Sequence, residues 1–444
     1  MNKIKSLSES NFLKLFFGFI TVCFFAAAFC LPDRAQMLSG LWNILSNPCK
    51  ITTNYIALGG FAATFMNMGL VCLVTTGIFY LTKATVNNVS TLAFQLTAGF
   101  CTWGINLLNI WPSFLGVVLY ALVKKEKLGG LANAMLFSTG ITPLISELML
   151  RYPNPETVGF NLPGICAALV VGAAIGFFLP AGLAHAPKVH KGFDLYSAAV
   201  PVGMTAFLLQ AILYKATGVA LPAAPGADTL AVASPVIVNT FCCVVFGLCI
   251  LLAFLLGCKP KDYWRLLTDP ENVTSFTATY GNAVMLMNVG VYGLFILGYY
   301  NLVGATFNGV LLGLIFCMLA TCNSGSHPGN VWPIMAGYVV SSLVFSTASQ
   351  LLGGSFTLAI NSQAIVSGLC YANGLSPIAD KYGARYGFAA AVLHYCMVTL
   401  VPSLHGGFCL YNGGFTAALV CLILVPELER FFRTKSDRLA AKTN

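Results

Sequence analysis

Long apolar stretches recur from one end of the chain to the other, and short polar segments separate them. Each stretch supplies the roughly 20 apolar residues that a helix needs to cross a hydrocarbon core of about 30 Å. The strict alternation of apolar and polar positions that marks a membrane β-strand is absent from the chain. The pattern therefore predicts an all-α polytopic membrane protein.

The apolar stretches divide evenly between the two halves of the chain. In the first half we predict spans at 12–31, 54–82, 86–104, 108–123, 129–150, 163–180 and 193–214. In the second half we predict spans at 233–257, 275–303, 306–321, 331–346, 364–380, 384–402 and 406–427. These are about seven spans per half, or 10–14 transmembrane helices in all, because the short pairs such as 86–123 are also compatible with re-entrant hairpins.

The two halves also repeat each other in sequence. In one fixed register without gaps, MNMG at Met66–Gly69 matches MNVG at Met287–Gly290, and NIWP at Asn109–Pro112 matches NVWP at Asn330–Pro333. We therefore predict two repeats, residues 1–222 and 223–444, within one integral membrane domain. Because seven spans is an odd number, the second repeat enters the membrane from the opposite side, so the repeats are predicted to have inverted topology.

The charges support a membrane protein and orient it. Only 8% of the residues are charged, whereas an ordinary soluble domain has about 25%, so no soluble domain is expected. The net charge of +9 comes from basic residues in short loops, at 124–127, 188–191, 258–265 and 380–385, and in the tail from Arg430. Such loops mark the cytoplasmic side, whereas the loops 32–50, 215–232 and 347–363 are not strongly basic and are predicted to lie outside. We predict a cytoplasmic (plasma) membrane protein with both termini in the cytoplasm and without a nucleic-acid partner.

The sixteen cysteines indicate packing rather than chemistry. None forms a C-x-x-C pair, and most lie inside apolar stretches, where cysteine is a small hydrophobic residue. His185 and His190 lack the spacing of a helical metal site. We therefore expect no metal, no cofactor and no catalytic residue.

A polar, helix-breaking stretch in each half predicts a solute site. NSGSHPGNVWP, at Asn323–Pro333, is the counterpart of TWGINLLNIWP, at Thr102–Pro112. Irregular polar backbone survives at membrane depth only inside the protein or along a wet cavity, and paired broken helices hold solutes near the midplane in many carriers. We predict that five residues of these breaks bind the solute together: Asn109, Asn330, His327, Ser324 and Asn323. The alternative is an aqueous loop between short spans.

Further polar residues are ranked below this pair of breaks. Thr85, Asn87, Thr306 and Asn308 begin the spans that lead into the breaks, where they could contact solute or cap helices. His327 replaces Asn106 of the first half, so a response to pH near neutrality is expected in one half only.

Two tyrosines and one histidine complete the set of candidates. Tyr196 and Tyr411 occur beside small residues in the matching stretches GFDLYSAA and GFCLYNGG. His394 lies in the middle of a span and is a candidate proton relay, because ionisable groups within a membrane are often functional.

The stretches HGGFCLYNGGF and SHPGNVWP carry a resemblance to a known family. They resemble a family of duplicated bacterial integral-membrane proteins that is classified as a domain of unknown function. The resemblance implies the duplicated membrane topology and brings no assigned substrate or site residues. The GF-x-LYNGG stretch is also similar to a part of urea transporters, although their full signature is missing.

The scarcity of buried charge favours a small, neutral polar solute, since a charged solute would need a counter-charge in a medium of low dielectric constant. We therefore predict a transporter or channel whose site lies at the repeat interface. Its partners are then the solute and the lipid bilayer, and a homo-oligomer is compatible with this sequence. Two alternatives stay open: a membrane-embedded enzyme acting on a lipid-type substrate, and a non-transporting membrane scaffold or sensor.

Overall fold

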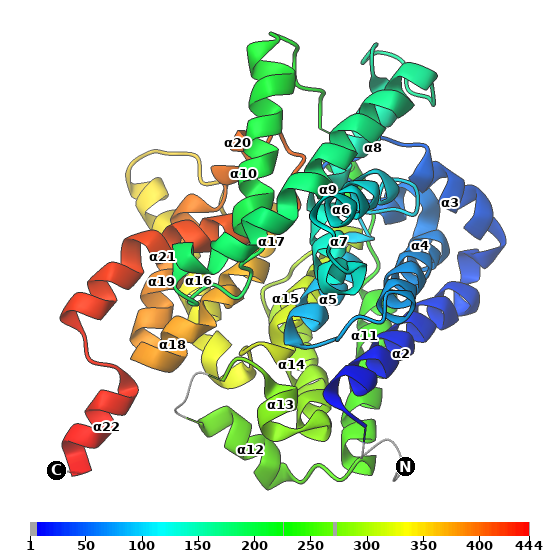
Figure 1. Ribbon diagram of the computed structural model, residues 1–444. Coiled ribbons are helices and arrows are strands. Elements are labelled where there is room, and N and C mark those ends of the chain that lie inside the picture. Colours follow the sequence, from blue (N-terminus) through cyan, green and yellow to red (C-terminus); the bar gives the residue numbers. More distant parts are fainter. Residues whose placement is uncertain (1–6, 225, 270–272, 444) are drawn as a thin grey trace.

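The computed structural model describes residues 7–224, 226–269 and 273–443, which form helices and loops with one isolated β-bridge between Ala233 and Asn308. Within these residues, eight helices are long and apolar enough to cross a membrane (Figure 1). This confirms the predicted all-α polytopic membrane fold. Residues 1–6, with which the predicted cytoplasmic N-terminus begins, lie outside the described part of the chain.

The first half contains the following α-helices: α2 (Glu9–Cys30), α3 (Met37–Leu45), α4 (Tyr55–Leu81), α5 (Asn88–Phe100), α6 (Trp111–Lys124), α7 (Ala132–Ser138), α8 (Thr142–Arg151), α9 (Leu162–His190) and α10 (Ala199–Gln210). A 3₁₀ turn at Thr139–Ile141 joins α7 to α8, and a π-helical turn at Ala211–Ala216 extends α10.

The second half repeats this order. Its helices are α11 (Pro235–Leu255), α12 (Pro260–Thr268), α13 (Phe276–Tyr280), α14 (Asn282–Leu302), α15 (Gly309–Leu319), α16 (Pro328–Leu351), α17 (Gln363–Ala372), α18 (Ser376–Tyr382), α19 (Ala384–Met397), α20 (Val401–Leu404), α21 (Asn412–Phe431) and α22 (Lys435–Thr443). A 3₁₀ turn at Asn373–Leu375 joins α17 to α18, as its counterpart joins α7 to α8.

Equivalent kinks show that the repetition extends to the backbone. Gly60 in α4 has φ 86°, and Gly281 between α13 and α14 has φ 89°. The two glycines correspond in the register that aligns MNMG with MNVG. Positive φ is readily adopted only by glycine, so each half uses a glycine to bend its entry into the long helix.

The equivalent helices α5 and α15 pack side by side in opposite directions. Thr91, in the first turn of α5, accepts a hydrogen bond from Asn323, just beyond the end of α15 (Nδ2 to Oγ1, 3.3 Å). Leu96 and Cys317, which correspond in the two repeats, meet midway along the pair, with the Cys317 Sγ 3.8 Å from the Leu96 carbonyl oxygen. An antiparallel pair of equivalent helices is the relation that an inverted duplication requires.

Loops that the charges assign to one side of the membrane also meet in space. Asn54 donates to the carbonyls of Thr229 (2.9 Å) and Val232 (3.0 Å), which joins two loops predicted to lie outside. At the other end of the molecule, Ser275 donates to Glu9 at 3.2 Å. The start of α2 and the C-terminal helix α22 lie toward the same end of the molecule (Figure 1).

The outer faces of the long helices are apolar. Several large side chains are more than half exposed there, among them Val170, Phe178, Val236, Leu251 and Leu343. Contact with lipid accounts for such exposure, because these side chains of membrane-spanning helices face hydrocarbon and not water.

Some span boundaries differ from those predicted. α16 begins at Pro328, three residues before the predicted start, because proline needs no N–H partner in a first helical turn. α16 also continues to Leu351, so it is a full-length span and not a short one. α10 begins at Ala199, which leaves residues 191–198 as a linker instead of part of the predicted span 193–214.

Candidate functional site

The first break, between α5 and α6, is held together by Asn109. Its Oδ1 accepts the Asn106 N–H at 2.9 Å, and its Nδ2 donates to the Gly104 carbonyl and to Ser146 Oγ, both at 2.9 Å. Both amide protons of Nδ2 therefore have protein acceptors. The Asn109 amide thus hydrogen-bonds to backbone groups of the break that neither flanking helix can pair with.

The second break, between α15 and α16, repeats this arrangement around Asn330. Its Oδ1 accepts the His327 N–H at 3.0 Å, and its Nδ2 donates to the Gly325 carbonyl at 2.8 Å and to Asp380 Oδ2 at 2.5 Å. Asp380 and Ser146 occupy corresponding positions in the two halves. The two asparagines therefore have the same structural role.

A second pair of asparagines braces each break from the neighbouring long helix. Asn67 donates to the carbonyls of Cys101 (2.8 Å) and Ile105 (2.9 Å). Asn288, its counterpart in the second repeat, donates to the carbonyls of Cys322 (2.8 Å) and Ser326 (3.0 Å). The side chains are fully buried, so these bonds replace water at carbonyls that would otherwise be unpaired.

The two breaks lie at opposite ends of the antiparallel α5–α15 pair. The Thr102 carbonyl, at the first break, is 3.2 Å from the position a Cβ on Gly309 would take, at the start of α15. Asn323, at the second break, contacts Thr91 at the start of α5. The 13 residues of α5 separate the breaks by about 20 Å. Asn109 and Asn330 are therefore not brought together, and the expected common midplane site does not form in this structure.

The remaining candidates of the second break also have protein partners. Asn323 Oδ1 accepts the Thr277 N–H at 2.9 Å, and Ser324 Oγ lies 3.5 Å from the Asn88 carbonyl. His327 is the N-cap of α16, because its Nδ1 accepts the Gly329 N–H at 3.2 Å. Burial lowers the pKa of His327 to about 4, and the positive charge of Lys435 makes a smaller contribution in the same direction. The expectation that His327 titrates near neutrality is therefore wrong.

The residues that begin α5 and α15 divide into two kinds. Asn87 and Asn308 are N-caps, with Oδ1 accepting the N–H of Ser90 (3.2 Å) and of Leu311 (2.9 Å). Thr85 and Thr306 are exposed. Capping, one of the two roles predicted for all four, thus belongs to the asparagines.

The stretches that contain Tyr196 and Tyr411 form loops that cross between the halves. The Leu195 N–H donates to the carbonyl of Gly374 (3.0 Å), in the turn between α17 and α18. The Leu410 N–H donates to the carbonyl of Gly140 (2.9 Å), in the turn between α7 and α8. We call residues 190–198 and 405–413 the crossing loops. Each loop therefore docks on a broken helix of the other half: loop 190–198 on α17–α18, and loop 405–413 on α7–α8.

The tyrosine hydroxyls make the crossing loops unequal. The Tyr196 hydroxyl lies 2.8 Å from Asn373 Oδ1 and 2.9 Å from the Cys317 carbonyl, so its loop is tied to α15. The Tyr411 hydroxyl is buried and has no hydrogen-bond partner among the described residues. Both tyrosines, predicted to line the site, lie at the centre of the molecule near Tyr371 and Phe100.

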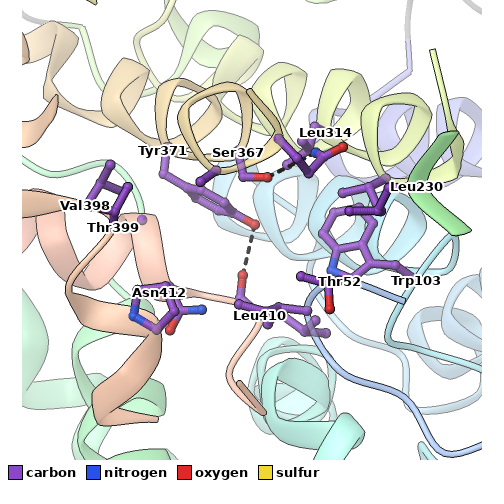
Figure 2. Close-up of a pocket in the computed structure, with 17 residues that line it drawn as sticks. Thr52, Trp103, Leu230, Leu314, Ser367, Tyr371, Val398, Thr399, Leu410 and Asn412 are labelled. Atoms are coloured by element: carbon purple, nitrogen blue, oxygen red, sulfur yellow. Dashed lines mark hydrogen bonds between the residues drawn. The ribbon is translucent and has the colours of Figure 1, made fainter. Parts of the chain in front are cut away.

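A cavity of about 370 Å³ lies beside this centre, between the two halves. We call it the seam cavity. Its wall includes Thr52 and Trp103 from the first half, and Leu314, Ser367 and Tyr371 from the second (Figure 2). The Tyr371 hydroxyl donates to the Leu410 carbonyl at 3.0 Å, which links the wall to the second crossing loop.

The wall of the seam cavity is uncharged. In the part of the chain that the structure describes, its 17 residues include no Asp, Glu, Lys, Arg, His or Cys. Its polar side chains are Thr52, Gln363, Ser367, Tyr371, Thr399 and Asn412. Asn308 supports this wall from behind, because its Nδ2 donates to Gln363 Oε1 at 2.9 Å. The volume and the mixture of apolar and neutral polar groups suit a small organic molecule.

His394 lies next to the seam cavity, without lining it. Its Nε2 is 2.9 Å from the carbonyl of Gly413, a residue of the wall, and its Nδ1 is 2.6 Å from the Tyr338 hydroxyl. Since a carbonyl only accepts, Nε2 carries the proton and Nδ1 accepts from tyrosine. The histidine therefore ties α16 to the start of α21, and its predicted role as a proton relay stays a prediction.

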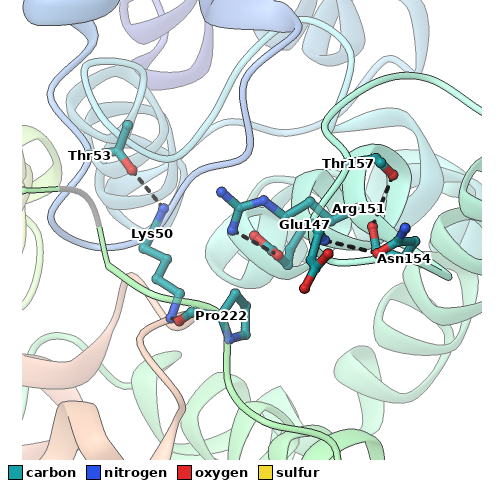
Figure 3. A network of polar contacts seen from close by, with 8 residues as sticks. Lys50, Thr53, Glu147, Arg151, Asn154, Thr157 and Pro222 are labelled. Carbon is teal, nitrogen blue, oxygen red and sulfur yellow. Dashed lines mark hydrogen bonds and ion pairs between the residues drawn. The ribbon is translucent and has the colours of Figure 1, made fainter.

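A cluster of charged side chains, Lys50, Glu147 and Arg151, lies beside the first break (Figure 3). It is at the end of the molecule where the loops 46–54 and 217–234 meet. Arg151 pairs with Glu147 at 3.3 Å, and the Lys50 Nζ donates to the Pro222 carbonyl. Burial lowers the pKa of Lys50 most, and Glu147 opposes that shift. The group lines a neighbouring pocket of about 250 Å³ and not the seam cavity.

Comparison with known proteins places the chain in a family. No curated protein and no solved structure matches it. The family model described as "protein of unknown function (DUF1576)" matches residues 33–215 and 259–430, which is most of the chain and one segment in each half. This agrees with the resemblance drawn from the motifs. The chain belongs to the DUF1576 family.

Proposed function

We propose that the protein is a carrier that moves a small, uncharged polar solute across the cytoplasmic membrane, with both termini in the cytoplasm. The observation that carries the proposal is the seam cavity, which lies between the two halves and has neutral polar groups on an otherwise apolar wall. Binding sites between inverted halves are the usual arrangement in secondary carriers, which alternate access by moving one half against the other.

The position of the cavity favours a carrier over a channel. Its wall includes Thr52 and Leu230, from loops at one end of the molecule, and reaches Leu314 within α15. Beyond it lie Tyr196 and Asn373, both buried and hydrogen-bonded to each other and to backbone carbonyls of α15. A cavity that ends on a packed polar cluster needs a conformational change before solute can pass.

The composition of the wall favours a carrier over an enzyme. Hydrolysis and group transfer usually need a nucleophile with a base, or a metal held by acidic, His or Cys side chains. Among the described residues, the cavity wall supplies none of these acidic, His or Cys groups. Its Thr, Ser, Gln and Asn side chains can replace the hydration shell of a neutral solute. A scaffold would have no need of such a cavity, and a sensor that binds a solute there is distinguished by the absence of uptake.

The test is an uptake panel in proteoliposomes made with the purified protein. The panel contains radiolabelled polyols, amides and uncharged nucleosides, together with carboxylates and amines of similar size. We expect saturable uptake of at least one neutral solute, above that of empty liposomes. Uptake of charged solutes alone, or of none, would overturn the proposal.

A further inference from the structure

Asp194 lies in the first crossing loop, in the linker between the spanning helices α9 and α10. Its side chain is only 2% exposed, although an acid beside Lys191 is expected to be solvated. Its Oδ1 accepts the Tyr196 N–H at 2.9 Å. Its Oδ2 is buried and has no hydrogen-bond partner among the described residues. A carboxylate with one orphaned oxygen is strongly disfavoured in such a place, whereas a carboxylic acid is tolerated.

Among the described residues, the charged or titratable side chains around Asp194 bind groups other than its carboxyl group. In its own loop, His190 accepts two backbone N–H groups at Nδ1 and lies 2.8 Å from Ser197 Oγ at Nε2. Lys191 pairs with Glu429 of α21 at 2.5 Å. Lys381, from α18, lies over the Phe193 ring at 4.9 Å.

One further titratable group, the Cys421 thiol from α21, lies near Asp194. It carries no positive charge. No described residue forms an ion pair with Asp194. Burial therefore raises its pKa to about 8, against the lowering effect of the Tyr196 N–H.

The place of Asp194 links its protonation to the docking of the loop. The Leu195 N–H binds the Gly374 carbonyl, and a Cβ on Gly374 would stand 3.0 Å from Asp194 Oδ1. The carboxyl group is thus covered by the broken helix of the other half. If the loop leaves that helix, water reaches the carboxyl group and its charged form becomes stable. Docking binds a proton and undocking releases it.

The two crossing loops differ at this position. Cys409 occupies the place of Asp194 in the second crossing loop, HGGFCLY against HKGFDLY. A carboxyl group is thus present at this position in only one of the two loops. This loop contains His190 and Lys191, at the end of the molecule predicted to face the cytoplasm.

We propose that Asp194 is a proton-binding site that couples the opening of the first crossing loop to proton release, and so makes solute movement proton-dependent. This inference rests on the proposed carrier function. One proton leaves the carboxylic acid for water when the loop undocks, and it returns when the loop closes.

Proton binding is tested directly, without transport, by infrared titration of the purified protein. We expect a protonated carboxyl component that disappears with a midpoint near pH 8, and we expect Asp194→Asn to lack this component. Glu156→Gln, which removes an exposed carboxylate, is the control and should keep the component. Asp194→Cys, which installs the residue of the other loop, serves if Asp194→Asn does not fold. A wild-type spectrum without such a component would overturn the proton site whatever is transported.

Coupling is tested in proteoliposomes with the neutral solute identified by uptake. We expect a pH gradient to drive accumulation in wild type and in Glu156→Gln. Asp194→Asn should lose that accumulation and keep solute exchange within about twofold. Solute accumulation in wild type that does not depend on the pH gradient would overturn coupling while leaving the carrier function intact. Absence of any uptake would count against the carrier, and the infrared titration would still decide the proton site.

Discussion

Leu410 donates its backbone N–H to the carbonyl of Gly140 at 2.9 Å, and this bond holds a loop of the second half against the broken helix of the first. The reciprocal bond joins Leu195 to Gly374 at 3.0 Å. The halves are therefore interlocked at their centre by two loops and not only packed side by side. Any movement of one half against the other has to change these two contacts, next to the seam cavity.

The docking of the loops depends on glycine. A Cβ on Gly140 would stand 2.5 Å from the Tyr411 ring, and one on Gly374 would stand 2.6 Å from the Tyr196 ring. Each ring is fully buried, so neither can move aside freely. We predict that Gly140→Ala and Gly374→Ala each destabilise the protein by about 1–3 kcal/mol through overpacking.

The measurement is the melting temperature in detergent, with unfolding monitored through the fluorescence of a thiol-reactive dye. Gly130→Ala is the control, because no described atom lies within 4 Å of its Cβ position. An unchanged melting temperature for both Gly140→Ala and Gly374→Ala would show that the crossing loops do not dock as described.

The paired asparagines predict destabilisation in both halves, somewhat larger for Asn288, whose Oδ1 also accepts the Tyr263 hydroxyl at 3.2 Å. Asn67→Ala and Asn288→Ala each leave two buried carbonyls without a donor, at a cost of about 1–3 kcal/mol per unsatisfied group. Asn239→Ala is the control, since its partner Asn301 is near the surface and can bind water. Chemical denaturation should rank the two brace variants together and below the control. A large loss for only one of them would contradict equivalent braces.

Part of this arrangement is predictable from the sequence, because it is local or repeated. The register of the repeat pairs Asn67 with Asn288 and Asn87 with Asn308, and capping depends only on the adjacent helix start. The polar breaks are predictable for the same reason, since glycine and proline disfavour a continuous helix. Polytopic topology follows from apolar length alone.

The site itself depends on contacts between distant segments. The inverted repeat predicts that α5 and α15 run in opposite directions, but nothing in their residues indicates that they pack against each other. The sequence therefore could not show that the two breaks lie at opposite ends of one helix pair. Ser367 and Gln363 belong to a helix without a distinctive motif and become cavity residues only by packing. Asp194 looks like a solvated residue until the other half covers it.

The pKa of His327 predicts a pH effect on stability in mildly acidic solution. Its folded pKa is lowered to about 4, so between about pH 4 and 6.5 the unfolded chain binds more protons than the folded one. Stability should therefore rise with pH over that range and be independent of His327 above it. His327→Asn, which copies Asn106, should show a smaller loss of melting temperature between pH 7 and 5. An equal loss in wild type and variant would contradict a buried, neutral His327.

Cysteine labelling tests the orientation. Ser355→Cys, in the exposed loop after α16, should react with a membrane-impermeant maleimide added to intact cells. Lys125→Cys, in the exposed loop after α6, should react only after the membrane is opened. The parent protein, which contains only the native cysteines, is the control for background labelling. Labelling of both sites from the same side would exclude the predicted topology.

The most direct test of the carrier proposal fills the seam cavity. Ser367→Leu places a larger apolar side chain on the wall, next to Tyr371, and Thr347→Leu adds the same bulk at an exposed position of α16 as the control. Initial uptake rates of the neutral solute are measured in proteoliposomes, with melting temperatures determined for both variants. We predict that Ser367→Leu lowers uptake by about tenfold or more, equivalent to about 1.4 kcal/mol, with a near-normal melting temperature, while Thr347→Leu transports like wild type. Normal uptake by a folded Ser367→Leu protein would show that the solute does not pass through the seam cavity.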